Sequence, residues 1–392
     1  MRSVSLVTNC LNILVCVISF SCLAAVDLHG FGSLRVGKIN AEEQNPNIVG
    51  LYQEDKLSWK DESLFGLQTH SDLTEDLSFT TQLIGKGVND FAPEVTLAFL
   101  RLDLANDQQL RFGRISMPLF SQSDVQYVGY AHDYSRLPKA TYWRFEYETA
   151  DGVSYQGKTT FDELSARYSL IWAEFNGNVF KNVVEDGVEI DLHAMQSLSL
   201  VLSYRQFEVF GGLLEAKTDG PKLDKFIFSP AIEQAVANSG VDSALQQEFF
   251  AVLSVNKNAR YQFWGARWQY ADWKFEFEKA QYGIAQSIDA FTYSQYIALS
   301  RRFDELIVTV HRERYLQNAN HAAGLAHLTP SPLVPLALQI SQAVNDPGYA
   351  MNVLSMRYDF ANSMALKADY FRGSSYTHGP FTGFSMGVDF VF

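Results

Sequence analysis

The chain ends in GFSMGVDFVF, residues 383–392, in which every second residue from Phe384 to Phe392 is large and apolar. This alternation is typical of a β-strand with one apolar and one polar face. Residues 383–387 also fit the G-x-S-x-G nucleophile elbow of hydrolases. An elbow needs a helix after its serine, but only five residues follow Gly387, and all of them continue the alternation. The strand interpretation is therefore favoured, and it places Ser385 and Asp389 on the polar face.

The N-terminus is typical of a secretory signal peptide. Arg2 precedes an apolar run at residues 11–18, and small residues follow up to Ala25. We therefore expect a leader over residues 1–25 and a single mature domain over residues 26–392. The three cysteines, at positions 10, 16 and 22, all fall inside the leader. A mature exported chain without disulfides must be held together by a large core or by a continuous hydrogen-bonded lattice.

The composition excludes two classes of protein. Hydrophobic residues make up 47% and aromatic residues 14% of the chain, yet the mean hydropathy is only −0.09. Beyond the leader, no apolar run approaches the ~18 residues of a membrane helix, which excludes a helical membrane protein. The net charge of −13 makes nucleic acid an unsuitable partner.

Alternating segments recur along the whole mature chain. Their short and long connections alternate, and an even number of strands with this rhythm is the pattern of an all-β transmembrane antiparallel barrel. Aromatic residues gather beside the short turns, as in the aromatic girdle of such a barrel at a lipid interface. Sixteen strands are predicted, at 27–38, 60–70, 75–86, 93–103, 108–116, 151–159, 164–175, 193–205, 207–217, 259–270, 273–282, 288–302, 305–315, 349–360, 363–372 and 381–392.

With its leader, cysteine-free mature chain, sixteen alternating segments and C-terminal phenylalanine, the sequence resembles the general porins of Gram-negative outer membranes. The resemblance implies a homotrimer in outer-membrane lipid. It also implies that the barrel-assembly machinery recognises a C-terminal signal formed by Met386, Val388, Phe390 and Phe392. In that family the third long extracellular loop folds into the lumen and narrows it. The corresponding connection here is 117–150.

The enteric Pro-Glu-Phe-Gly-Gly stretch is missing from this connection, so the constriction cannot be carried over residue by residue. The local candidates are Asp124 and Asp133 on the loop, facing Arg35 and Arg101 on the wall. Opposed acids and arginines would create a transverse field that filters ions by charge. The alternative is a solvated surface loop whose charges have no role in conduction.

Other motifs suggest different chemistry. Residues 152–159 match the phosphate-binding pattern G-x-x-x-x-G-K-[ST], but their alternation indicates a strand. His321 and His327 lie six residues apart, a spacing that does not bring metal ligands together on a helix or strand. Residues 229–255 have a helical composition and are expected to form a helix at the rim or a lid over the mouth.

The sequence thus predicts a porin that lets small hydrophilic solutes and ions diffuse passively through a water-filled lumen, with no catalytic residues, metal site or cofactor. A substrate-specific channel for a sugar or an anion is the main alternative. An outer-membrane hydrolase built on Ser385 is a further one. It would require a histidine and an acid beside the serine, and His378 falls in the preceding loop.

Overall fold

The computed structural model describes residues 26–41, 52, 56–142, 148–179, 188–219, 230–254, 256–289, 291–318, 323–329, 331–344, 348–377 and 379–392. The predicted leader at 1–25, with its three cysteines, lies outside the described residues. So do His321 and His378.

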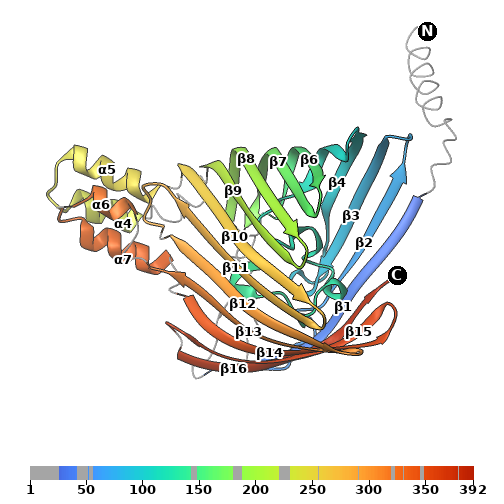
Figure 1. Ribbon diagram of the computed structural model, residues 1–392. Coiled ribbons are helices and arrows are strands. Elements are labelled where there is room, and N and C mark those ends of the chain that lie inside the picture. The colour runs from blue at the N-terminus through green and yellow to red at the C-terminus, as the bar shows by residue number, and fades with distance from the viewer. Residues whose placement is uncertain are drawn as a thin grey trace, which may run out of the picture.

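Within the described residues the chain forms sixteen strands that close into one antiparallel barrel (Figure 1). Each strand pairs with its neighbours in sequence, and the first strand pairs with the last. All sixteen predicted strands are therefore confirmed. The strands are β1 (Val26–Ala41), β2 (Leu64–Asp72), β3 (Leu77–Lys86), β4 (Pro93–Leu104), β5 (Gln108–Ser116), β6 (Thr149–Phe161), β7 (Leu164–Val179), β8 (Val188–Tyr204), β9 (Phe207–Asp219), β10 (Asn258–Tyr270), β11 (Trp273–Ile284), β12 (Thr292–Phe303), β13 (Leu306–Gln317), β14 (Gly348–Ala361), β15 (Met364–Ser375) and β16 (Gly379–Val391).

Two strands begin four residues later than predicted. The strand expected from residue 60 begins at Leu64, because the amide of Ser63 donates to the carbonyl of Lys60 and closes a turn there. The strand expected from residue 288 begins at Thr292, because Ile288 is buried among helices outside the barrel wall. In both cases a local contact outside the sheet overrides the alternating pattern.

The two faces of the wall differ as the alternation requires. On β14, Leu354 and Met356 are exposed on the outside, while Ser355 and Arg357 are buried on the lumen side. Large aromatic side chains are exposed on the outer face beside the short turns, as the girdle prediction expects. They include Tyr204, Phe207, Tyr270, Trp273, Phe303, Tyr358, Phe360 and Phe392.

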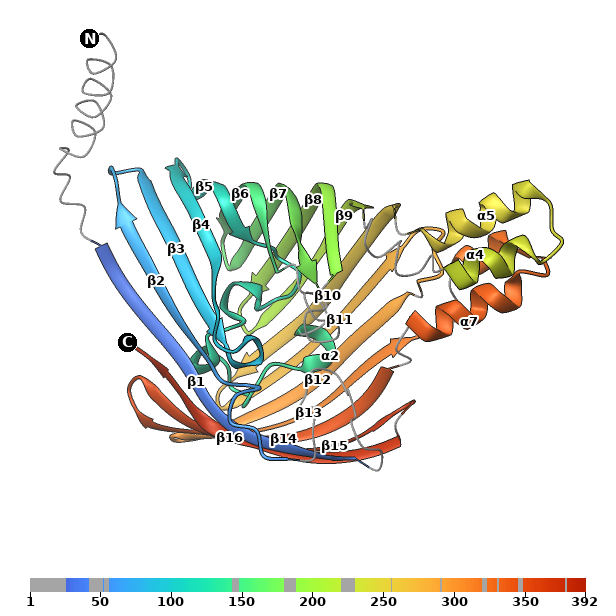
Figure 2. The ribbon, with the colours of Figure 1, turned by 180° about the vertical axis from the view of Figure 1, so that it is seen from behind.

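Four helices gather beyond the long-loop rim, at the end of the barrel opposite the C-terminus (Figures 1 and 2). The connection between β9 and β10 forms α4 (Pro230–Ala237) and α5 (Ser243–Leu253), which confirms the helical prediction for this stretch. The connection between β13 and β14 forms α6 (Ala323–His327) and α7 (Val334–Val344). We call this group the helical cap.

The cap has an apolar core of its own, which also receives a residue from the connection between β11 and β12. The buried core residues are Val236, Phe249, Val252, Leu253, Ile288, Leu328, Leu333, Ala337 and Ile340.

None of the described helices is both long enough and apolar enough to cross a membrane.

The seam between β1 and β16 closes the barrel. The two strands pair continuously from Phe31 opposite Val391 to Ala41 opposite Phe381. On the outer face, the rings of Phe390 and Phe392 are stacked with their centroids 6.5 Å apart. They lie over Gly32 and Gly30, where a Cβ atom on Gly32 would stand 2.5 Å from the Phe390 ring. Glycine on β1 therefore leaves room for the terminal rings to cover the seam.

We expect Gly32→Val to weaken closure of the barrel, because the added side chain displaces the Phe390 ring from the seam. The expected loss in the free energy of unfolding is about 1–2 kcal/mol, typical of overpacking where a ring can partly move away. Urea unfolding followed by tryptophan fluorescence in detergent measures it. Leu34→Val, on the exposed face of the same strand, is the control and should change little. Equal unfolding midpoints for the two variants would contradict this role of the glycine.

Candidate functional site

The connection between β5 and β6 turns into the barrel instead of extending from the rim. Its described part, residues 117–142 and 148, carries the short 3-10 turns η2 (Ser123–Val125) and η3 (Gly129–Ala131) and the helix α2 (Lys139–Tyr142). Figure 2 shows α2 and the other described parts of this loop inside the ring of strands. We call residues 117–148 the lumen loop.

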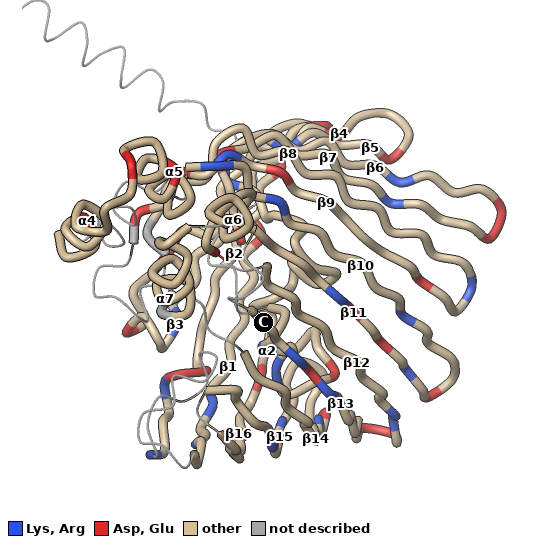
Figure 3. Tube along the Cα trace, turned by 90° about the vertical axis from the view of Figure 1, so that its left-hand side faces the viewer, with Lys and Arg blue, Asp and Glu red and all other residues tan. Residues whose placement is uncertain are grey.

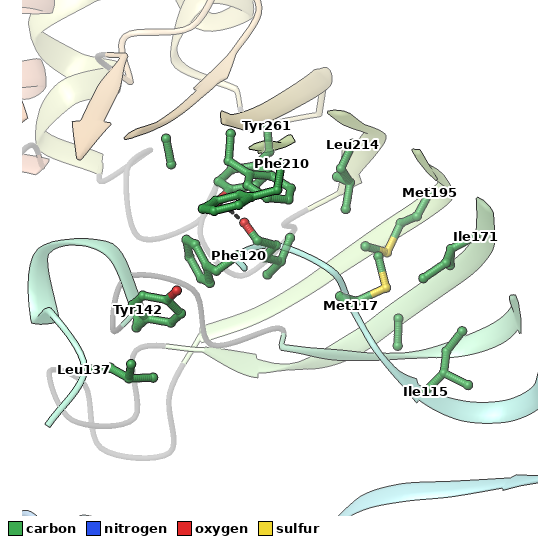
Figure 4. Close-up of a cluster of buried hydrophobic side chains, with 14 of the residues drawn as sticks. Ile115, Met117, Phe120, Leu137, Tyr142, Ile171, Met195, Phe210, Leu214 and Tyr261 are labelled. Atoms are coloured by element: carbon green, nitrogen blue, oxygen red, sulfur yellow. Dashed lines mark hydrogen bonds between the residues drawn. The ribbon is translucent and has the colours of Figure 1, made fainter. Parts of the chain in front are cut away.

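The first residues of the lumen loop pack on an apolar patch of the wall. Met117 and Phe120 are buried against residues of β7–β10 that include Met195 and Phe210 (Figure 4). The hydroxyl of Tyr261 donates to the carbonyl of Leu119 beside this cluster. Inward-facing apolar residues on these strands thus meet the loop and not water, which explains why this part of the wall is not uniformly polar.

Two glutamates on β11 hold the middle of the lumen loop. Glu278 accepts hydrogen bonds from the hydroxyls of Tyr142 at 2.8 Å and Tyr296 at 3.2 Å, and from the amide of Ser121 at 3.0 Å. Its neighbour Glu276 accepts from the hydroxyl of Tyr134. Burial, reinforced by the charge of Glu278, holds the pKa of Tyr142 well above its usual range, so its hydroxyl stays a donor.

Basic residues on β14 and β15 bind the main chain of the loop. The ammonium group of Lys367 donates to the carbonyls of Gly129 and His132, each at 2.6 Å. The guanidinium of Arg357 donates to the carbonyls of Tyr130 at 2.7 Å and His132 at 2.9 Å. Charge-assisted bonds of this kind are stronger than neutral ones and fix the path of the backbone.

Glu62, in the connection between β1 and β2, binds the far end of the loop. Its carboxylate lies 3.0 Å from Arg136 and 3.1 Å from Lys139, and it accepts a 2.7 Å hydrogen bond from Tyr52. Burial alone would raise the pKa of Glu62, but Arg136, Lys139 and Arg35 outweigh burial and hold that pKa well below its usual range. Glu62 is therefore ionised at neutral pH and binds both loop cations.

The loop also contains a buried histidine that does not act as a switch near neutral pH. Burial, with a smaller contribution from Lys367, lowers the pKa of His132 to about 3. The side chain is therefore neutral above that pH, and its Nδ1 lies 2.8 Å from Oε1 of Gln122.

Two of the predicted constriction residues lie in contacts that hold the loop. Arg35 is only 5% exposed; its guanidinium lies 2.8 Å from both oxygens of Asp389 and 2.6 Å from the hydroxyl of Ser135. Asp133 pairs with Lys274 of β11 at 3.1 Å. Burial opposes ionisation of Asp133, but Lys274 lowers its pKa below the usual value.

The other two predicted residues lie in a different part of the lumen. Asp124 is exposed on η2, and its charge interacts with Arg111 of β5. Arg111 lies directly opposite Arg101 of β4 in the strand register, and Arg101 pairs with Asp103 at 2.9 Å. Among the residues that the structure describes, Arg111 has no ion-pair partner within 4 Å. The structure therefore brings together Asp124, Arg101 and Arg111.

Arg111 was not among the site residues predicted from the sequence, although the strand register could have identified it. The short turn at residues 104–107 sets the register of β4 and β5, and it places residue 111 beside residue 101 on the same face. The loop-holding residues Glu62, Lys367 and Arg357 had no comparable signal, because their partners are distant in sequence.

The two sequence motifs that suggested other chemistry, the phosphate-binding pattern and the nucleophile elbow, both lie on strands. Residues 152–159 are within β6, where the backbone pairs with β5 and β7 and cannot wrap a phosphate. Residues 383–387 are within β16, which continues to Val391 with no helix after Ser385. In the part of the chain that the structure describes, no three His, Cys, Asp or Glu side chains come together as a potential metal site.

Comparisons with known proteins identify the fold as that of porins. No family model and no curated protein sequence matches the chain. Among solved structures, the chain is similar to an anion-selective porin from Comamonas acidovorans, with 13% identity and a TM-score of 0.55 over 94% of this chain and 100% of the other.

Two further structures give the same result. OmpF of Salmonella typhi, solved in complex with daunomycin, shows 12% identity and a TM-score of 0.55 over 94% of this chain and 98% of the other. A loop-deletion mutant of OmpT, an outer membrane protein of Vibrio cholerae, shows 12% identity and a TM-score of 0.55 over 94% and 100%. At such identities the likeness is one of fold: the chain is a sixteen-stranded porin-like barrel.

We expect Glu62→Gln to release the far end of the lumen loop. The substitution leaves Arg136 and Lys139 buried without their carboxylate, and breaking a buried ion pair in this way costs about 3–5 kcal/mol. Trypsin cleaves after arginine and lysine, so the folded variant should be cut at Arg136 or Lys139 while the wild-type barrel resists. Mass spectrometry of the fragments identifies the sites.

The matched control is Asp90→Asn, which removes the partner of Lys60 in an exposed ion pair. Exposed pairs contribute little to stability, so the loop should stay protected in this variant. Resistance of Glu62→Gln to trypsin, in a barrel shown to be folded, would contradict the role of Glu62.

Proposed function

We propose that the chain is an outer-membrane porin that forms a water-filled channel for passive diffusion of small hydrophilic solutes and ions. The observation that carries this proposal is a closed barrel with an apolar outer face, a charged lumen wall and a loop bound inside the lumen. A barrel of sixteen strands is wide enough to leave an aqueous path even when a loop occupies part of it. In this proposal residues 1–25 are the export leader, and residues 26–392 are the channel.

In this proposal, charge selectivity comes from opposed charges on the lumen loop and on the part of the barrel wall formed by β4 and β5. Asp124 on the lumen loop faces Arg101 and Arg111 on β4 and β5. A field between an acid and two arginines orients dipolar solutes and filters ions by charge. Arg35 and Asp133 act differently here: they hold the loop in place and so set the width of the channel.

The proposal also covers the membrane, the oligomeric state and the assembly signal of the channel. The outer face contacts outer-membrane lipid, and three copies assemble into a homotrimer, as in the trimer form in which OmpT of Vibrio cholerae was solved. Met386, Val388, Phe390 and Phe392 form the signal for the barrel-assembly machinery. In the finished barrel Met386, Val388 and Phe390 alternate with Gly387 and Asp389 along β16, and Phe392 follows the end of that strand.

A substrate-specific channel is the alternative, and one observation favours an anion as its substrate. Arg111 is a cation of the wall without an ion-pair partner within 4 Å among the described residues, and it lies beside Arg101. The hydrolase reading is not favoured, because Ser385 lies in the middle of β16, where its backbone pairs with β1 and β15. We propose that the protein is not an enzyme.

Planar lipid bilayers test the proposed function. We expect purified protein to give stepwise conductance, and the ratio of anion to cation permeability to change by about a factor of two when one charge of the site is removed. Asp124→Asn should shift the reversal potential towards anion selectivity, and Arg111→Gln should shift it towards cation selectivity. Asp133→Asn, on the same loop but paired with Lys274, is the matched control and should have the smaller effect.

Silent bilayers from correctly folded protein would overturn the channel. If the protein conducts but the reversal potential is unchanged in both Asp124→Asn and Arg111→Gln, the proposed channel is retained and the proposed selectivity site is wrong. The substrate-specific channel would be favoured if one anion species, added at low concentration, blocks the current that other ions carry.

A further inference from the structure

The tip of the lumen loop lies close to the short-turn end of the barrel. The loop starts at the long-loop end, where the amide of Met117 donates to the carbonyl of Glu148. Its tip, η3, is bound at the other end. There the hydroxyl of Tyr130 donates a 2.8 Å hydrogen bond to the carbonyl of Asn362, in the turn between β14 and β15. The loop therefore extends along most of the length of the lumen.

Contacts with the neighbouring strands place the tip at the same depth. Arg357 donates to the carbonyl of Tyr130, and its guanidinium lies over the Tyr130 ring, 4.7 Å from the centroid. Lys367 binds the tip from β15. Both basic residues lie within about four residues of the turn at 362–363. With ~3.3 Å per residue and a strand tilt of ~40°, they are at most roughly 10 Å from the rim.

The part of the rim that binds the tip is itself held in place. Arg357 pairs with Asp359 at 2.7 Å, and Arg302 lies 3.4 Å from the same carboxylate. The amide of Asp359 donates to the carbonyl of Glu305, in the turn between β12 and β13. The tip of the loop is therefore attached to two linked turns and not to a free hairpin end.

The charges of the proposed selectivity site lie at this same end of the barrel. Arg101 and Arg111 lie within about four residues of the turn between β4 and β5. Asp124, whose charge acts on Arg111, precedes the tip in the loop. Figure 3 shows α2 inside the ring of strands beside β12 and β13, across from β5–β8. The loop and the two arginines thus face each other near the short-turn rim, which in an outer-membrane barrel is the periplasmic one.

We propose that the charge filter lies close to the periplasmic mouth, and that Tyr130 is the positioning residue that keeps it there. The bond from Tyr130 to Asn362 holds the tip on the rim, and so fixes the distance between Asp124 and the two arginines. Solutes that enter the cell meet this filter last, after passing the rest of the lumen. The inference rests on the proposed function, because it concerns where the channel selects ions.

Cysteine labelling in cells tests the location of the tip. The three cysteines of the chain, at positions 10, 16 and 22, fall in the proposed leader, so an introduced cysteine is the single thiol of the mature protein. The probe is a maleimide with a polyethylene glycol chain too large to pass a porin. It is added to intact cells and to cells with a permeabilised outer membrane.

Two matched substitutions are compared. Ala131→Cys places the thiol on the exposed loop tip, and Ala244→Cys places it on an exposed position of the helical cap. We expect Ala244→Cys to be labelled in intact cells, and Ala131→Cys to be labelled only after permeabilisation. Labelling of Ala131→Cys in intact cells, or its failure to label after permeabilisation, would overturn the periplasmic location of the tip.

Planar bilayers test the role of Tyr130. Tyr130→Phe removes the bond to Asn362 but keeps the ring on Arg357. We expect the conductance to rise about 1.5-fold, because the tip moves from the wall. In this background the reversal-potential shift caused by Asp124→Asn should fall to about half or less, since residues that act as a unit are not additive.

The matched control is Tyr376→Phe, which removes the hydroxyl that binds Arg314 on the outer face, and it should leave conductance and selectivity unchanged. A merely destabilising substitution lowers the number of folded channels but not the selectivity of each one. Wild-type conductance in Tyr130→Phe, together with a full Asp124→Asn shift, would overturn the positioning role. Silent bilayers from the folded wild type would instead overturn the proposed function.

Discussion

Backbone hydrogen bonding is the constraint on which the rest of this structure depends. A wall surrounded by lipid has no water to satisfy its N–H and C=O groups, so every strand must have a partner on both sides. Pairing of β1 with β16 meets this requirement and removes the free edges. Closure then divides the side chains into an outer set, which is apolar, and an inner set, which is free to carry charge. The buried ion pairs and the bound loop both follow from that division.

The inside of the barrel uses charge where a soluble domain of this size would use an apolar core. Arg35, Glu62, Lys367 and Asp389 are all buried, yet each has at least one partner of opposite charge. Such groups give weak net stability but strong geometric specificity, because a wrong arrangement leaves a charge unpaired in a poorly solvated site. This suits a loop that must keep one position inside a lumen. The apolar patch around Phe210 supports the same loop from the other side.

The alternating pattern predicted the fold almost completely, because the contacts that define a strand are local and repeat every two residues. The last strand was predicted for the same reason, from the alternation of the last residues of the chain. The contacts of the lumen loop could not be predicted in this way. Lys367 binds carbonyls more than 230 residues away, and no periodic pattern encodes such a distance. Arg111 lies between these cases, since a short turn placed it beside Arg101 while only the folded loop brought Asp124 near both.

The helical cap joins three long connections through one core, those between β9 and β10, between β11 and β12, and between β13 and β14. Six strands that are otherwise linked only edge to edge thus gain a common brace at one rim. Local opening of any one of the three connections exposes this shared core, so we expect the three connections to open as one cooperative unit. The rim is therefore divided into a stiff sector under the cap and a sector that deforms more easily. Bending of this barrel is expected to follow that division.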